Sequence, residues 1–367
     1  MSRSCCKAIY FNVVAFGVVL TTLSLYVYYG STVASCKTTI SDVEKPVMEK
    51  PIVEKPIVLV WFTPFGITFD FNDCGKYFNI TSCTLTYDKS LYNQSSAVII
   101  FHKDIHGNLM NLPKEPRPPF QKWIWYHVES PTNTGKVPGL ENLFNLTLNY
   151  RRDADITVRT ELMTKNYISR EDFVLPPKTK LLCWIVSNTV QATGTAIRER
   201  YYHELSQHIK VDIFGSGFTA NRLPYEAYFS SIASCKFYLS FENSIHRDYI
   251  TEKVNGPLKL NGPLAVGTVP VVLGPPRKNY EDFVPGDSLV HVNDFPDAKS
   301  LAEFLKRLDA DDNAYRRYFQ WREHFSAHRH PVTDNHKYLK AICTACDYSG
   351  RNRDYRVIPN LHKWYFG

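Results

Sequence analysis

The sequence has no charged residue between Lys7 and Lys37. Within this gap, residues 8–29 are mostly apolar, and about 20 apolar residues are enough to cross a bilayer as a helix. Basic Arg3 precedes the run, so the positive-inside tendency makes residues 1–7 a cytoplasmic tail. We therefore predict a single-pass type II membrane protein with a transmembrane signal-anchor. Small residues after the run leave a cleaved signal peptide as the alternative, although the run is longer than a usual signal core.

The chain also lacks a concentrated basic patch. Its net charge is +7, yet its basic residues are scattered, with pairs such as Arg151-Arg152 and Arg316-Arg317. A nucleic-acid-binding protein would gather this charge on one face, so an enzyme with an anionic substrate explains it as well. With 367 residues and 44% hydrophobic content, the chain can bury a large core, and its length predicts about two domains beyond the N-terminal segment.

A second Cys-x-x-Cys pair is missing, which disfavours zinc binding by the pair at Cys343 and Cys346. Of the nine cysteines, three lie in or near the predicted anchor and the segment after it. The rest form an even set beyond a membrane anchor, which predicts disulfide bonds in an oxidising lumen. They are Cys74, Cys83, Cys183, Cys235, Cys343 and Cys346.

A five-residue repeat with proline in every unit covers residues 44–58. Such a repeat favours an extended chain, so we interpret residues 30–56 as a stem and expect folding to begin near Ile57. Three Asn-x-Ser/Thr sequons predict N-glycosylation in the secretory pathway. They are at Asn79, Asn93 and Asn145.

Mainly apolar runs of strand length occur in two series, on either side of Pro176-Pro177, and the runs of the first series are uninterrupted. Such runs are typical of parallel strands that are covered on both faces. They occupy residues 57–62 and 97–101 in the first series, and 181–186, 211–214, 237–239 and 269–273 in the second. The sequence therefore predicts an α/β fold of two Rossmann-like halves. Helical spacing of apolar residues predicts helices over 195–210 and 298–309.

Polar side chains follow the expected strand at 237–239, and the next apolar run stops at Gly274 and Pro275. Strand ends in open α/β sheets collect ligands, and a sugar nucleotide needs directional hydrogen bonds and a cation for its diphosphate. The residues run Phe237-Tyr238-Leu239-Ser240-Phe241-Glu242-Asn243-Ser244 and then Asp248-Tyr249-Ile250-Thr251-Glu252-Lys253. This order resembles the donor-binding signature of the Golgi α1,3-fucosyltransferases, glycosyltransferase family 10.

The resemblance implies the two-domain arrangement called GT-B. An acceptor-side domain would span residues 57–177, and a GDP-fucose-binding domain would span residues 178–367, with a C-terminal tail that returns to the first domain. The implied reaction moves L-fucose from GDP-fucose to the 3-hydroxyl of GlcNAc in N-acetyllactosamine-type glycans on glycoproteins or glycolipids, as in Lewis-type antigens. The implied location is the Golgi membrane, with the catalytic part in the lumen, and a homodimer through Cys36 is left open.

Residue roles follow from the same resemblance. It implies that Cys74 and Cys83 pair with the Cys-x-x-Cys segment and that Cys183 pairs with Cys235. Lys253 and Arg198 would hold the diphosphate. The implied donor contacts are Ser187, Asn188, Arg198, Tyr238, Glu242, Asn243, Tyr249, Glu252 and Lys253.

Period-two alternation places Trp123, Trp125, His127 and Glu129 on one face of an expected strand that stops at Ser130-Pro131. Aromatic faces suit sugar rings, and a carboxylate near apolar surface tends to have a raised pKa, as a general base requires. Spacing alone leaves a solvated strand-end glutamate as the alternative. The segment resembles the Glu-Ser-Pro motif of the family, so we predict that Glu129 takes the proton of the acceptor hydroxyl, which attacks fucose with inversion.

Two Asp-x-Asp pairs raise a metal-dependent GT-A transferase as a rival. One pair is Asp153 and Asp155, and the other is Asp309 and Asp311. Such short matches are common by chance, and the first pair lies in a segment that resembles GT-B relatives. Because GDP leaves as a stable anion, one base and some cations suffice. We therefore predict no required metal or other cofactor, with Mn²⁺ as a stimulant at most.

Two departures from the family pattern stand near the predicted site. Residues 254–259 are almost repeated by residues 260–265, and the two Gly-Pro pairs disfavour a continuous helix just after Lys253. Relatives carry Pro-Tyr-Gly where this chain has Val-Arg-Thr-Glu at 158–161, so a tyrosine near the donor is absent. These departures sustain an alternative from another class, a catalytically weak Golgi homologue that binds glycans or partner transferases.

Overall fold

The computed structural model describes residues 55–158, 173–219, 223–258, 264–326 and 336–367, with the short strand segments 164–165 and 260–261. The chain divides into a unit of residues 1–54 and a unit of residues 55–367. The predicted tail, anchor and nearly all of the predicted stem therefore lie outside the described residues, as do residues 159–161. Within the described ranges, no helix is long and apolar enough to cross a membrane.

A six-stranded sheet in the order β2-β1-β3-β4-β5-β6 forms the first half of the larger unit, and all its neighbouring strands run parallel. Its central strands are buried along their whole length, as expected for apolar runs that are covered on both faces. The strands are β1 (Ile57–Val60), β2 (Thr84–Thr86), β3 (Ala97–Phe101), β4 (Lys122–Tyr126), β5 (Leu146–Asn149) and β6 (Ile156–Thr157).

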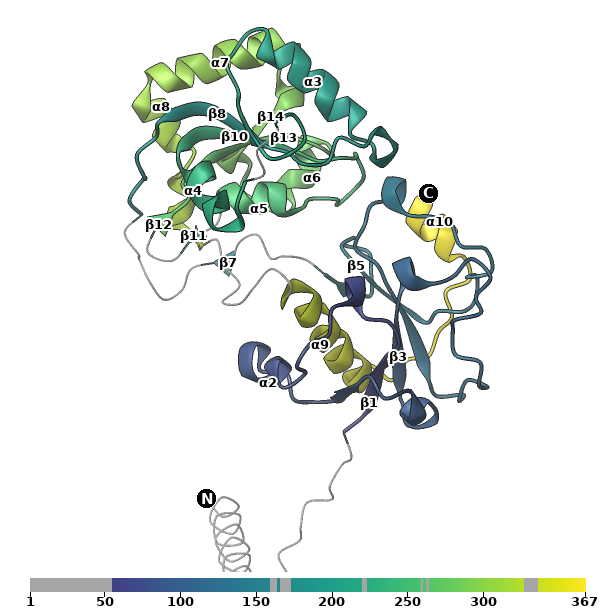
Figure 1. The fold of residues 1–367 in the computed structure, drawn as a ribbon. Coiled ribbons are helices and arrows are strands. Elements are labelled where there is room, and N and C mark those ends of the chain that lie inside the picture. Colours follow the sequence, from purple (N-terminus) through teal and green to yellow (C-terminus); the bar gives the residue numbers. More distant parts are fainter. Residues whose placement is uncertain are drawn as a thin grey trace, which may run out of the picture. The chain divides into compact units, whose positions relative to one another are not determined.

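Two helices from the far end of the sequence cover this sheet. Helix α9 (His336–Arg351) shares one apolar cluster with Ile124 and Tyr126 of β4, and α10 (Leu361–Phe366) shares the other with Trp123 and Trp125. Figure 1 shows both helices in yellow beside strands of the first half. The predicted alternation along β4 is thus confirmed, because successive side chains enter opposite faces.

Disulfide bonds tie α9 to the beginning of the first half. Cys74, in α2 (Asp73–Phe78), is bonded to Cys343, and Cys83 is bonded to Cys346. A third bond joins Cys183 to Cys235 in neighbouring strands of the second half. These are the pairings that the family resemblance implied, and both cysteines of the Cys-x-x-Cys segment are consumed by them.

The second half is a five-stranded parallel sheet in the order β14-β13-β10-β8-β9. Figure 1 shows α3 and α7 over one face and α4 and α5 over the other. The strands are β8 (Lys180–Ile185), β9 (Asp212–Phe214), β10 (Cys235–Phe241), β13 (Val269–Leu273) and β14 (Val290–His291). The helices are α3 (Ala196–Ser206), α4 (Tyr228–Ala233), α5 (Glu252–Leu258), α6 (Arg277–Glu281), α7 (Ala298–Ala310) and α8 (Asp312–Arg317). The predicted parallel α/β sheets and both predicted helices are confirmed, although α3 ends earlier than expected.

Minor elements complete the described chain. Strands β7 (Thr164–Lys165) and β15 (Phe325–Ser326) pair antiparallel, as do β11 (Leu260–Asn261) and β12 (Leu264–Ala265). Short 3₁₀ helices connect the larger elements. They are Pro64–Gly66, Lys89–Gln94, His102–Asp104, Pro131–Asn133, Gln191–Thr193, Tyr225–Ala227, Gly286–Ser288, Val292–Asp294 and Gln320–Glu323.

The expected break just after Lys253 is wrong. Helix α5 continues through the first Gly-Pro pair with Pro257 inside it, and the second copy of the repeat forms the β11–β12 hairpin. A proline inside a helix normally leaves one helical carbonyl without its donor. Here that carbonyl belongs to Lys253, and the Ser240 hydroxyl donates to it at 2.7 Å.

Candidate active site

A cavity of about 430 Å³ opens where strands of both sheets end. From the first half it receives residues that follow β3 and β4, and from the second half it receives residues that follow β8 and β10. The carboxyl ends of parallel strands are where α/β proteins bind ligands. The lining residues are Lys103, Glu129, Asn133, Asn188, Thr193, Asn243, Tyr249, Thr251, Glu252 and Lys253.

Glu129 reaches the cavity from the segment that follows β4. The Tyr365 hydroxyl, from α10, donates a hydrogen bond to the Glu129 backbone carbonyl. Next to it, the buried His127 ring lies against the Tyr365 ring, with 5.5 Å between ring centroids. The backbone that presents Glu129 is therefore held by the C-terminal helix and by β5, whose Leu148 carbonyl accepts from the His127 N–H at 3.0 Å.

Lys253 brings a positive charge to the cavity from the second half. Its ammonium lies 2.9 Å from Glu252 Oε1, 3.4 Å from Glu242 Oε2 and 2.9 Å from Thr251 Oγ1. Burial alone would lower the pKa of Lys253, but the two carboxylates raise it above its ordinary value. Burial alone would raise the pKa of Glu252, but Lys253 lowers it to about 2. Both groups therefore stay ionised at neutral pH.

Five of the nine predicted donor contacts line the cavity. They are Asn188, Asn243, Tyr249, Glu252 and Lys253. Tyr249 is also packed by the Tyr150 ring, with 5.2 Å between centroids, which fixes its ring edge-on. Ser187 is exposed next to Asn188 but is not among the lining residues.

Arg198, Tyr238 and Glu242 bond to protein groups and do not line the cavity. The buried Arg198 guanidinium donates to the backbone carbonyls of Asn188 and Phe241, and burial lowers the pKa of Arg198. Glu242 is 1% exposed, and its Oε1 accepts from the Thr251 backbone N–H at 2.8 Å. Their contact with a donor stays a prediction, and the geometry gives them a role in supporting the residues that do line the cavity.

The sequence reasoning missed four lining residues, Lys103, Asn133, Thr193 and Thr251. Lys103 and Asn133 follow β3 and β4, so the same strand-end argument that singled out Glu129 would have found them. Thr193 lies in the segment after β8, which approaches the residues that follow β10. Gly194 has a φ of +89°, and a Cβ there would stand 2.7 Å from the Asn243 carbonyl oxygen. That close approach could not be read from the sequence.

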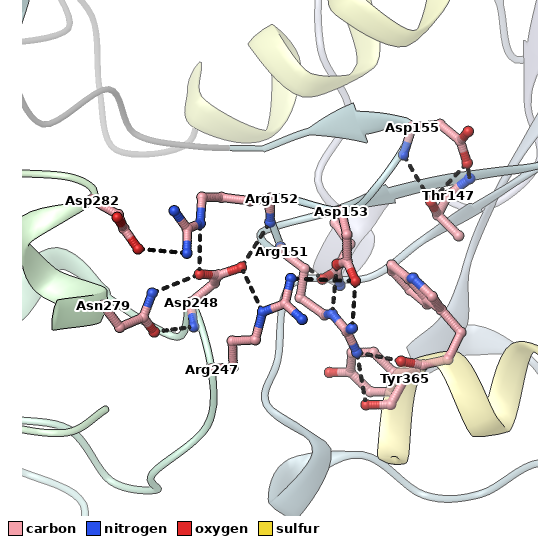
Figure 2. A network of polar contacts seen from close by, with 12 residues as sticks. Thr147, Arg151, Arg152, Asp153, Asp155, Arg247, Asp248, Asn279, Asp282 and Tyr365 are labelled. Atoms are coloured by element: carbon pink, nitrogen blue, oxygen red, sulfur yellow. Dashed lines mark hydrogen bonds and ion pairs between the residues drawn. The ribbon is translucent and has the colours of Figure 1, made fainter. Parts of the chain in front are cut away.

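A polar network joins the segment after β5 to the signature segment after β10 (Figure 2). Asp248 is 1% exposed and accepts from the Arg152 backbone N–H at 2.9 Å, from Arg152 Nε at 3.1 Å and from Asn279 Nδ2 at 2.7 Å. Its own N–H donates to Asn279 Oδ1, and its φ is +63°. Burial would raise the pKa of Asp248, but these donors lower it. The network thus fixes a left-handed aspartate directly before Tyr249.

Two further contacts link the Glu-Ser-Pro segment to the same loop. The buried Ser244 hydroxyl donates to Ser130 Oγ at 2.7 Å. His246 Nε2 accepts from the Thr132 backbone N–H at 3.3 Å and lies 2.7 Å from Thr132 Oγ1. The loop that carries the predicted base and the loop that carries the predicted donor contacts therefore support one another.

The aspartates of the two Asp-x-Asp pairs engage separate partners. Asp153 pairs with Arg151 at 2.7 Å, and Asp155 accepts from Thr147 N at 2.8 Å and contacts Arg356. Asp309 pairs with Lys236, and Asp311 caps α8. Across the described residues, no group of three metal-ligating side chains occurs.

The three sequons differ in exposure. Asn79 and Asn93 are exposed. Asn145 is 1% exposed, its Nδ2 donates to the Arg356 carbonyl at 2.6 Å, and its Oδ1 accepts from Trp123 N at 2.8 Å. Burial of this nitrogen, which donates to a backbone carbonyl, disfavours a glycan on it. Glycosylation at Asn145 therefore stays a prediction, and the internal position of this amide argues against it.

Comparisons with known proteins agree with the geometry. Residues 53–161 match the family model "Fucosyltransferase, N-terminal", and residues 175–364 match "Glycosyltransferase family 10 (fucosyltransferase) C-term". The chain is 46% identical over 316 residues to 4-galactosyl-N-acetylglucosaminide 3-alpha-L-fucosyltransferase 9 of Homo sapiens, with 84% of this chain and 82% of that protein covered. It is 37% identical over 312 residues to 3-galactosyl-N-acetylglucosaminide 4-alpha-L-fucosyltransferase FUT3 of Bos taurus, with 84% and 81% covered.

A solved structure supports the fold. The crystal structure of an α1,3-fucosyltransferase with GDP-fucose matches with a TM-score of 0.51 and 17% identity, covering 86% of this chain and 96% of that one. The family models cover both sheets and the cavity between their strand ends. The chain belongs to glycosyltransferase family 10, the fucosyltransferases.

Proposed function

We propose that this protein transfers L-fucose from GDP-fucose to the 3-hydroxyl of GlcNAc in N-acetyllactosamine-type glycans. The observation that carries the proposal is the cavity that both Glu129 and Lys253 line. Relatives named as N-acetylglucosaminide 3-alpha-L-fucosyltransferases support the linkage. A fold similar to that of an α1,3-fucosyltransferase solved with GDP-fucose supports the GT-B arrangement.

The reaction needs one base and a stabilised leaving group. Glu129 takes the proton of the acceptor hydroxyl, and the oxygen then attacks the anomeric carbon from the face opposite GDP, which inverts the configuration. The bond from that carbon to the diphosphate breaks, and the electron pair leaves with GDP. Lys253, whose raised pKa keeps it charged, neutralises the departing phosphate. No general acid is needed, because GDP leaves as an anion.

We further propose that the protein acts as a single-pass type II protein of the Golgi membrane, with residues 55–367 in the lumen. Three disulfide bonds support an oxidising compartment. The exposed sequons at Asn79 and Asn93 support passage through the secretory pathway.

The test is fucose transfer by the full chain, purified in detergent. The protein is incubated with GDP-fucose and N-acetyllactosamine in the presence of EDTA, and products are analysed by mass spectrometry. The expected product is heavier by one fucose and loses it on treatment with α1,3-fucosidase. If no product forms, even with sialylated acceptor and with Mn²⁺ in place of EDTA, the transferase proposal fails and a glycan-binding homologue is favoured.

A further inference from the structure

The Ser240 hydroxyl lies outside the cavity but contacts the backbone of Lys253, which lines it. Ser240 is 0% exposed in β10, and its Oγ donates to the Lys253 carbonyl oxygen at 2.7 Å. Along β10, Phe237, Leu239 and Phe241 enter the apolar cluster under α3 and α7. Because strand side chains alternate, Ser240 enters the opposite face, where α5 begins.

Pro257 explains why this contact matters. In an α-helix, the carbonyl of Lys253 would accept the backbone N–H of residue 257. Proline has no N–H, so helix α5 cannot satisfy this carbonyl from within. A buried carbonyl without a donor is costly, and Ser240 supplies the donor from the neighbouring strand.

Glu242 holds the other end of the same short segment. It follows Ser240 by two residues, and its Oε1 accepts from the Thr251 N–H at 2.8 Å and from Thr251 Oγ1 at 3.0 Å. Residues 251–253 are thus fixed at both ends, because Glu242 accepts from the Thr251 N–H and Ser240 donates to the Lys253 carbonyl. All three of these residues line the cavity.

We propose that Ser240 is a positioning residue for Lys253, and that it takes over the carbonyl that Pro257 leaves without a helical donor. The inference rests on the proposed function only in assigning Lys253 to the donor diphosphate. It accounts for the way in which this chain accommodates a Gly-Pro pair directly after its signature lysine.

The experiment is a double-mutant cycle between positions 240 and 257 in the full-length protein. Ser240→Ala is expected to weaken GDP binding, measured by calorimetry, and to raise KM for GDP-fucose by roughly tenfold, with a smaller change in kcat. Pro257→Ala alone is expected to leave both values unchanged. The double variant is expected to recover GDP affinity to within about threefold of the parent, because the alanine that replaces Pro257 has a backbone N–H that can donate to the Lys253 carbonyl.

Ser288 provides a matched control. It is also 0% exposed, and its hydroxyl donates to the Pro285 carbonyl at 2.6 Å. Ser288→Ala is expected to leave GDP affinity unchanged. Adding Pro257→Ala to Ser288→Ala is expected to leave it unchanged as well. Unchanged GDP binding in Ser240→Ala would overturn the proposal, as would equal rescue of both serine variants by Pro257→Ala.

Two readouts keep this test separate from the proposed function. If the parent protein transfers no fucose, the GDP affinities of the variants still decide the role of Ser240. If the parent does not bind GDP, the coupling between positions 240 and 257 in the free energy of unfolding decides it, and additive effects would overturn the proposal. Should Ser240→Ala fail to fold, the double variant is expected to fold, and its failure would count against the inference.

Discussion

At the scale of single residues, the site depends on where each polar side chain turns at its strand end. Glu129 and Lys253 both line the cavity. Strand-end position and the family motif were enough to predict both. Arg198 and Glu242 are also a cation and a carboxylate, like Lys253 and Glu129, but they bond to backbone groups of the protein. The sequence could not separate these two groups, because the direction of a side chain depends on which backbone donors or acceptors the fold brings near it.

Removal of the predicted base gives the most direct prediction at this scale. Glu129→Gln is expected to lower kcat by about 100-fold or more, because general base catalysis contributes on this order, while GDP affinity stays within about twofold of the parent. Steady-state kinetics and calorimetry measure the two quantities. The exposed Glu323→Gln serves as the control and is expected to have parental kinetics. Parental kcat in Glu129→Gln would assign the base to another residue.

The sequons give a second prediction at the residue scale. Asn79→Gln and Asn93→Gln are each expected to remove one N-glycan from the protein made in the secretory pathway, because both side chains are exposed. Asn145→Gln is expected to remove none but to lower the free energy of unfolding by about 1–3 kcal/mol, because it disturbs buried hydrogen bonds. Intact-mass measurement before and after deglycosylation counts the glycans. A mass loss for Asn145→Gln would contradict the buried position.

At the scale of elements, the buried parallel strands were the easiest to predict, because an uninterrupted apolar run of strand length such as Ala97–Phe101 needs cover on both faces. Strand β5 was missed. It is fully buried, but Thr147 and Asn149 are polar and bond to Asp155 and to the His127 carbonyl. Helix α5 was misjudged for a related reason. The donor that compensates for Pro257 comes from Ser240 in another element, so no local pattern reveals it.

The turn between β8 and α3 carries a prediction about an element. Gly194→Ala is expected to weaken GDP binding by roughly tenfold and to lower thermal stability, because a methyl group there meets the Asn243 carbonyl and the residue has a positive φ. Calorimetry and thermal unfolding measure both effects. Gly135→Ala is the matched control, since a Cβ at Gly135 has no neighbour within 4 Å. Equal effects of the two substitutions would mean that the turn does not shape the cavity.

At the scale of the whole described unit, stability is expected to fall as the pH is lowered below about 6.5. Burial lowers the pKa of four histidines, which are His102, His127, His246 and His291. In the unfolded chain these histidines bind protons near pH 6.5, whereas in the folded protein they stay neutral to lower pH. The free energy of unfolding is therefore highest at pH 7 and above, and it decreases as the pH falls.

Unfolding by denaturant at several pH values between 5 and 8 measures this dependence. Each histidine that stays neutral contributes a slope of about 1.4 kcal/mol per pH unit below its unfolded pKa. His246→Gln removes one of the four groups, so its profile is expected to be less steep than that of the parent. A profile that is flat down to pH 5 would show that the pKa values of these histidines are the same in the folded and the unfolded protein.

The placement of α9 and α10 also sets an order of events during synthesis. Strands β1 to β6 leave the ribosome first, but both apolar faces of their sheet are covered by helices that are made after the entire second half. The carbonyl of Arg356 that binds the Asn145 amide, and the two cysteines that bond to Cys74 and Cys83, arrive equally late. The strands of the second sheet and the helices that cover it are contiguous along the chain, so this half can fold before α9 and α10 are made. The half that is translated first is therefore the half that finishes folding last.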